Sequence, residues 1–154
     1  MLFLRRASGN VLLHTKDHYP KGAFRVPSGG VRNQESLLDA VHRETFEETG
    51  LQVAVERFLA VVLFDFRWHE STIPLSSYLF LLRERGGQLE VQDSHEHITA
   101  FREVALSGLK SVAYHLENLP PARRDWGLFR AIPHRLAAEL LQESLRKPEP
   151  PHSG

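Results

Sequence analysis

The chain has 154 residues, of which 42% are hydrophobic and 25% charged, which suits one globular domain with its own core. Its formal net charge is zero, so no overall basic field favours nucleic acid, and the lack of cysteine excludes disulfides, thiolate metal sites and a cysteine nucleophile. The first residues do not resemble a signal peptide, and no apolar run is long enough to cross a bilayer, so we expect a cytoplasmic protein with no membrane segment.

Apolar alternation and turn residues place strands through most of the chain, and helices follow. We predict strands over residues 2–6, 11–16, 24–26, 52–66, 73–83, 89–91 and 98–104. The strand over 52–66 should bulge near Glu56, and residues 67–71 should form a loop. Helical spacing predicts helices over 107–118 and 125–145, and Pro133 should either kink the second or mark its start. Residues 1–146 would then form a single mixed α/β domain, followed by a disordered tail over 147–154.

A further helix is predicted between Ser36 and Gly50. Ser36 suits the N-cap, with Asp39 as its capping-box partner, and Gly50 suits the left-handed residue that ends a helix. At 3.6 residues per turn, three glutamates near its end continue the apolar stripe of its first half. These are Glu44, Glu47 and Glu48. Like charges at this spacing repel, so a cation should offset them, and carboxylate oxygens suit a hard divalent ion.

This segment resembles the Nudix box in every fixed position. The matching residues are Gly29, Glu35, Arg43, Glu44, Glu47, Glu48, Gly50 and the apolar Leu51. One position departs softly from the family pattern, since Thr45 stands where a bulky aliphatic residue is usual. The resemblance implies a Nudix-type α/β/α sandwich with a mixed, largely antiparallel sheet, in which the box helix packs against the sheet.

The resemblance also implies a reaction, namely hydrolysis of a nucleoside diphosphate linked to another moiety by attack of water on phosphorus. It implies Mg²⁺ or Mn²⁺ as the cofactor, bound by Glu44, Glu47 and Glu48 and by a loop carbonyl at Gly29 or Gly30. Either Glu47 or Glu48 would also orient the attacking water. We expect Arg43 to clamp a carboxylate, because its neighbours in the motif are acids and its planar fork suits bidentate pairing.

Some members of the family take their general base from a later loop, and Glu96 is the candidate here. His95 and His97 flank it and could face the same way in an extended segment, which raises the alternative of a zinc site. The absence of a third ligand at zinc-site spacing makes that alternative the less favoured one.

Substrate recognition is less constrained by the sequence. Arg25, Tyr19 and Trp68 are the candidates to contact a nucleotide base, although side chains of this kind more often pack in a core or a loop. Two downstream markers, a proline for ADP-ribose and a tyrosine for dinucleoside polyphosphates, are both absent from residues 65–68. The sequence therefore favours neither substrate.

The expected partner is a small nucleoside diphosphate derivative. The alternative from another class is a non-catalytic nucleotide-sensing module on the same fold, since fold does not fix function. RNA is a less favoured substrate because the chain has no basic run. We also expect a homodimer, with the late helices and the N-terminal strand supplying the interface.

Overall fold

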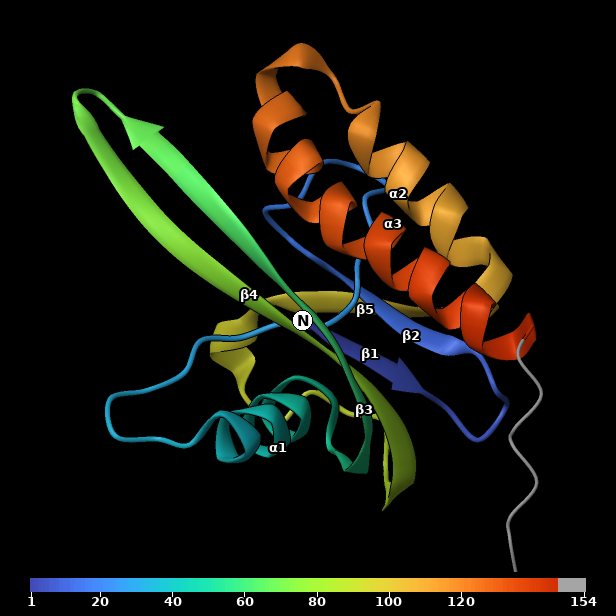
Figure 1. Ribbon diagram of the computed structural model, residues 1–154. Coiled ribbons are helices and arrows are strands. Elements are labelled where there is room, and N and C mark those ends of the chain that lie inside the picture. The colour runs from blue at the N-terminus through green and yellow to red at the C-terminus, as the bar shows by residue number, and fades with distance from the viewer. Residues whose placement is uncertain (147–154) are drawn as a thin grey trace, which may run out of the picture.

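A five-stranded mixed sheet forms the centre of the molecule in the computed structural model, which describes residues 1–146 (Figure 1). The strand order is β3-β4-β1-β2-β5, and every neighbouring pair is antiparallel except β1 and β4. The strands are β1 (Leu2–Arg5), β2 (Val11–Lys16), β3 (Leu51–Trp68), β4 (Ser71–Gly87) and β5 (Ile98–Val104). The predicted mixed, largely antiparallel sheet is thus confirmed, and the predicted tail lies outside the described residues.

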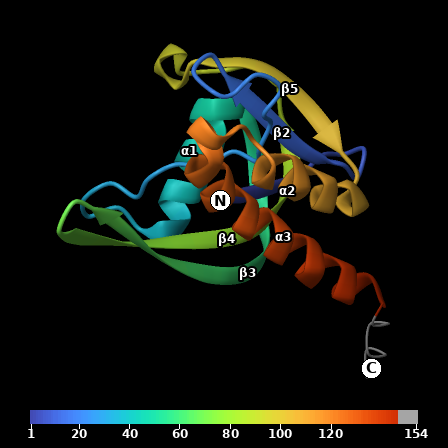
Figure 2. The same ribbon diagram turned by 90° about the horizontal axis from the view of Figure 1, so that it is seen from above.

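Helices cover both faces of this sheet. They are α1 (Leu37–Thr49), α2 (Leu109–Glu117) and α3 (Arg124–Arg146), with short 3₁₀ turns at η1 (Ser94–Glu96), η2 (Leu106–Gly108) and η3 (Pro121–Arg123). Successive side chains of a strand point to opposite faces, so Leu2 and Leu4 of β1 pack in the core on the α1 side. Phe3, between them, packs in the core that contains Ala137 of α3. The predicted sandwich is therefore confirmed (Figure 2).

The two longest strands form a hairpin that extends well beyond the rest of the sheet (Figure 1). We predicted strands over 52–66 and 73–83 with a loop over 67–71, but pairing continues to Trp68 and Ser71 and leaves only two residues in the turn. His69 makes this tight turn possible because it adopts a positive φ of 52°. The register shifts between Val55 and Arg57, which confirms the predicted bulge near Glu56.

Two of the short predicted strands are absent. Over residues 24–26 only one isolated bridge forms, between Arg25 and His14. Residues 89–91 form no strand, and the backbone in and just after this segment bonds the end of α1 instead. Glu90 N donates to Thr49 O at 3.0 Å, and Gln92 N donates to Glu47 O at 3.0 Å. These bonds satisfy carbonyls that the end of a helix leaves free, and they guide the following residues along α1.

The structure bears on two expectations about the ends of the domain. Pro133 lies inside α3, which begins at Arg124, so the proline does not mark the start of that helix. The N-terminal strand β1 pairs with β4 on one side and β2 on the other, so it has no free edge for a dimer interface. No helix within the described residues is long and apolar enough to cross a membrane.

Candidate active site

Helix α1 carries the acidic residues of the candidate site, and both of its ends are capped as the sequence predicts. Ser36 Oγ accepts a hydrogen bond from Asp39 N at 3.1 Å, and Gly50 adopts a φ of 70° and closes the helix with a bond to Phe46 O. Thr45 is fully buried, and its hydroxyl donates to Val41 O at 2.7 Å, so the smaller residue fits the packed side of the helix.

Arg43 links several carboxylates of this region. Its Nε and Nη2 atoms donate to the two oxygens of Glu35 at 2.6 and 2.8 Å. Its Nη1 atom donates to Glu44 at 2.7 Å and to Glu47 at 3.0 Å. Another bond from Nη2 reaches Gly30 O at 2.9 Å and ties the glycine loop to the helix. The bonds from Arg43 hold the pKa of Glu35 near 2, and one guanidinium offsets part of the charge of three acids.

Three carboxylates converge next to this arginine. Glu44, Glu47 and Glu96 each offer one oxygen, and these atoms lie within 4.8 Å of one another. Glu96 belongs to η1, which reaches Glu47 because the backbone before it is bonded to the end of α1: Asp93 N donates to Glu47 O at 3.1 Å. An all-oxygen, all-carboxylate donor set fits a hard divalent cation such as Mg²⁺ or Mn²⁺.

The glycine loop lies directly against this cluster. A Cβ atom added at Gly29 would lie 1.8 Å from Glu44 Cδ, whereas one added at Gly30 would meet nothing within 4 Å. The Gly29 backbone therefore approaches the Glu44 carboxylate as closely as only glycine allows.

Glu48, a predicted metal ligand, does not join the three-carboxylate cluster. Its side chain is fully buried, Ser28 N donates to its Oε2 at 3.1 Å, and Lys16 Nζ lies 3.2 Å from its Oε1. Lys16 also bonds Glu96 at 2.6 Å, so one ammonium group separates Glu48 from the cluster. Burial raises the pKa of Glu48 to about 7, although Lys16 and Arg25 favour its charged form.

The histidines beside Glu96 bind aspartates instead. His95 Nδ1 lies 2.9 Å from Asp93, and His97 Nδ1 lies 3.1 Å from Asp17. Over the described part of the chain, neither histidine joins a group of three residues able to hold a metal ion.

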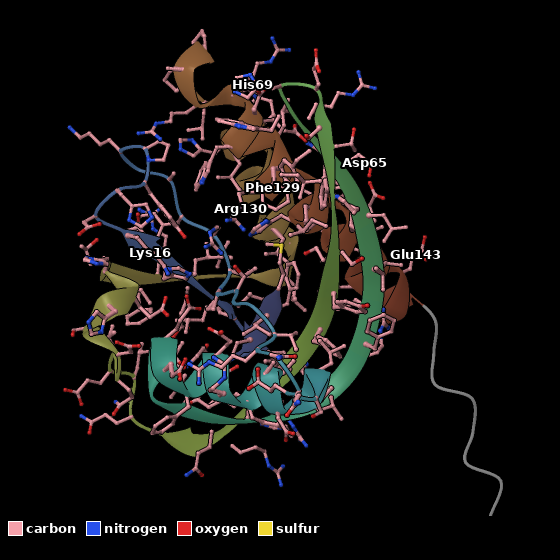
Figure 3. The ribbon with its side chains drawn as sticks, turned by 90° about the vertical axis from the view of Figure 1, so that its left-hand side faces the viewer. Lys16, Asp65, His69, Phe129, Arg130 and Glu143 are labelled. Carbon is pink, nitrogen blue, oxygen red and sulfur yellow. The ribbon has the colours of Figure 1, made fainter. Side chains whose placement is uncertain are left out.

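A cavity of about 650 Å³ lies beside the cluster, and both helix layers contribute to its lining. Glu44 and Val41 of α1 line one side of it, and Phe129 and Arg130 of α3 line another. In Figure 3 these two α3 residues lie near the middle of the molecule, whereas His69 lies at the end of the hairpin. The volume of the cavity is in the range of sites that bind small molecules.

The cavity includes one of the three residues proposed for substrate binding. Arg25 lines it. Tyr19 packs on the Trp126 ring with centroids 5.0 Å apart and does not line the cavity, and Trp68 is 68% exposed at the hairpin tip against His69. Sequence reasoning missed the contribution of α3 and the role of Lys16, because both depend on contacts between distant segments and no local motif marks them.

Comparisons with known proteins support this picture. Residues 1–126 match the model of the NUDIX domain. The NAD-capped RNA hydrolase NudC of Chromobacterium violaceum is 31% identical over 75% of this chain and 43% of its own length. An ADP-ribose pyrophosphatase of Methanocaldococcus jannaschii is 31% identical over 75% of this chain and 66% of its own length, so the chain spans less than two thirds of either relative.

Similarity in structure extends over more of the chain. The solved structure of a C. elegans Ap4A hydrolase binary complex has a TM-score of 0.57 at 16% identity, and the alignment covers 92% of this chain and 95% of that one. This likeness shows the fold alone. The match over residues 1–126 shows that the chain belongs to the NUDIX family.

Proposed function

We propose that the protein is a Mg²⁺- or Mn²⁺-dependent pyrophosphohydrolase that cleaves a nucleoside diphosphate linked to another moiety. The observation that carries this proposal is the convergence of Glu44, Glu47 and Glu96 within 4.8 Å beside a cavity of about 650 Å³. Membership of the NUDIX family and two curated relatives named as hydrolases of pyrophosphate compounds or capped RNA support it.

The residues divide the work of such a reaction. Glu44 and Glu47 would hold the cation, which when bound neutralises charge on the diphosphate and polarises its phosphorus–oxygen bonds. Arg43 fixes both of these carboxylates, and Lys16 fixes Glu96. Glu96 is the proposed general base. It accepts a proton from the attacking water as the water oxygen bonds to phosphorus and the bond from phosphorus to the bridging oxygen breaks.

A substrate screen with matched variants tests this proposal. Purified protein is incubated with ADP-ribose, nucleotide sugars, dinucleoside polyphosphates and nucleoside triphosphates, each with Mg²⁺ and with Mn²⁺. We expect turnover of at least one class, and a fall of about 100-fold or more in kcat for E44Q and E47Q. E70Q, at the exposed hairpin turn, is the control and should keep full activity. Stabilisation by nucleotides without any turnover would instead support the non-catalytic sensing module.

We also propose a cytoplasmic homodimer whose protomers are single domains over residues 1–146. The hairpin supports the dimer, because it exposes large apolar side chains that an isolated protomer leaves in water, among them Leu63 at 77%, Trp68 at 68% and Ile73 at 53%. Light scattering at micromolar concentration measures the mass directly, and a monomer mass would contradict the proposal.

A further inference from the structure

Two arginines line the cavity without a carboxylate partner. Arg25 is only 3% exposed, and its Nη1 atom donates to Val26 O at 2.9 Å and to Ser28 Oγ at 2.7 Å. Its Nε atom is buried and has no hydrogen-bond partner, and the same is true of Arg130 Nε. Within residues 1–146, no acidic side chain forms a salt bridge with either arginine.

Other arginines of the same molecule have the carboxylate partner that Arg25 and Arg130 lack. Arg43 and Arg135 each bind a carboxylate through two nitrogen atoms, at Glu35 and Glu117 respectively. Arg25 and Arg130 instead rest on aromatic rings: the Arg25 guanidinium lies 5.1 Å from the Tyr19 ring centre, and that of Arg130 lies 4.6 Å from the Phe129 ring centre. A ring face offsets only part of the cost of taking a guanidinium out of water.

The two charges also act on each other. Burial lowers the pKa of Arg130 to about 10, and the positive charge of Arg25 contributes in the same direction. The Arg130 guanidinium therefore stays charged at neutral pH. The Glu48 carboxylate attracts both groups but forms no salt bridge with either, and both Nε donors stay unused. These donors suit an anion from outside the chain.

Arg130 reaches the cavity from a different helix than Glu44 does. Arg130 belongs to α3, which packs on the opposite face of the sheet from α1, and both helices line the same cavity (Figure 3). Arg130 also lies beyond residues 1–126, which are the part matched by the NUDIX domain. The C-terminal helix α3 thus adds Arg130 to a cavity that Arg25 and α1 already line.

We propose that Arg25 and Arg130 form a phosphate-binding position at the α3 side of the cavity. There they hold a phosphate of the bound nucleotide while Glu44 faces the anhydride to be cleaved. A planar guanidinium matches the oxygens of a phosphate in a bidentate way, and two such groups supply more donors than a neutral sugar or base requires. The proposal rests on the proposed function for the identity of the nucleotide, but anion binding itself does not require hydrolysis.

The test measures binding without metal and without turnover. Titration calorimetry in EDTA gives the Kd of inorganic pyrophosphate for the full chain and for R130Q, R130K and R124Q. Loss of a charge-assisted bond to phosphate should weaken binding about tenfold or more in R130Q and less in R130K. Arg124 is exposed on the same helix and does not line the cavity, so R124Q should bind within about twofold of the wild type.

The outcomes separate this inference from the proposed function. Unchanged pyrophosphate affinity in R130Q overturns the phosphate position, even if the enzyme hydrolyses nucleotides. Equally tight binding of malonate, a dicarboxylate, shows a general anion site and overturns the assignment to phosphate. Failure to hydrolyse any nucleotide, with the arginine-dependent binding intact, rejects the proposed function alone. If R130Q does not fold, as its thermal unfolding curve would show, the affinity of R130K decides.

Discussion

His134 makes the stability of the domain depend on pH in a direction that the structure fixes. It lies on α3 and is fully buried. Its Nδ1 atom is 2.7 Å from Arg130 O, and its Nε2 atom accepts a hydrogen bond from Val26 N at 3.1 Å. The ring therefore joins α3 to the segment that leads into the glycine loop, and it must be neutral to accept that bond.

The magnitude follows from the pKa. Burial lowers the pKa of His134 from 6.5 to about 4, so the unfolded chain binds a proton between these values and the folded chain does not. Stability is therefore complete above about pH 6.5 and falls as the pH drops toward 4. A pKa difference of about 2.5 corresponds to about 3 kcal/mol of unfolding free energy.

The variant H134Q isolates this contribution. Glutamine keeps an oxygen to accept from Val26 N and an amide to donate to Arg130 O, but it does not titrate. Urea unfolding followed by tryptophan fluorescence gives the free energy of unfolding at pH 7.5 and at pH 4.5. We expect the stability advantage of the wild type over H134Q to shrink by about 2 to 3 kcal/mol between these values.

A difference measurement is needed because other groups titrate as well. Glu48 acts in the opposite direction: burial raises its pKa to about 7, so the folded state gains a proton first as the pH falls. Comparing wild type with variant at each pH cancels this effect. The variant H115Q, at an exposed histidine of α2, controls for the loss of an imidazole. If the advantage over H134Q stays constant within 1 kcal/mol from pH 7.5 to 4.5, the reasoning fails.

Two further substitutions test the site. G29A places a methyl group against the Glu44 carboxylate, so we expect the Mn²⁺ affinity measured by calorimetry to fall about tenfold or more. In the control G30A the added methyl group meets nothing within 4 Å, so this variant should keep the wild-type affinity. Equal Mn²⁺ affinities of the two variants would contradict the close approach of Gly29 to Glu44. K16M removes the cation beside buried Glu48, so it should destabilise the protein by about 2 kcal/mol at pH 8 and by less at pH 5, where the Glu48 carboxyl is protonated. If urea unfolding gives the same loss of stability at both pH values, the pairing of Lys16 with Glu48 is not the cause.

Local patterns in the sequence were sufficient to predict helix α1 and both of its ends. Ser36 and Gly50 fix its ends through backbone chemistry that depends only on near neighbours, and both predictions are confirmed. The bulge near Glu56 is likewise visible as a break in alternation. Helical spacing also placed Glu44, Glu47 and Glu48 on one broad stripe, but it did not show that β2 brings Lys16 against one edge of that stripe.

Features that depend on distant segments could not be predicted. Residues 89–91 have the composition of a strand, yet Glu90 N donates to Thr49 O, one of the carbonyls that the end of α1 leaves free. Arg130 reaches the cavity only because α3 packs across the sheet, and nothing in its local sequence distinguishes it from the exposed Arg124. The fold class was therefore predictable from one motif and its alternation, whereas the α3 side of the site was not.

The parallel pairing of β1 with β4 also constrains the order in which the chain folds. Leu2 pairs with Phe80, so this contact closes a loop that contains β2, α1 and β3, whereas the β3–β4 hairpin needs only a tight turn. Closing the long loop costs conformational entropy before the contacts between β1 and β4 can stabilise the chain, so the pairing of these two strands is a slow step. Because Leu2 and Phe80 both line the cavity, a chain with its hairpins and α1 already formed still lacks a binding site. Ligand binding during refolding would therefore report the closure of the sheet and lag behind the formation of secondary structure.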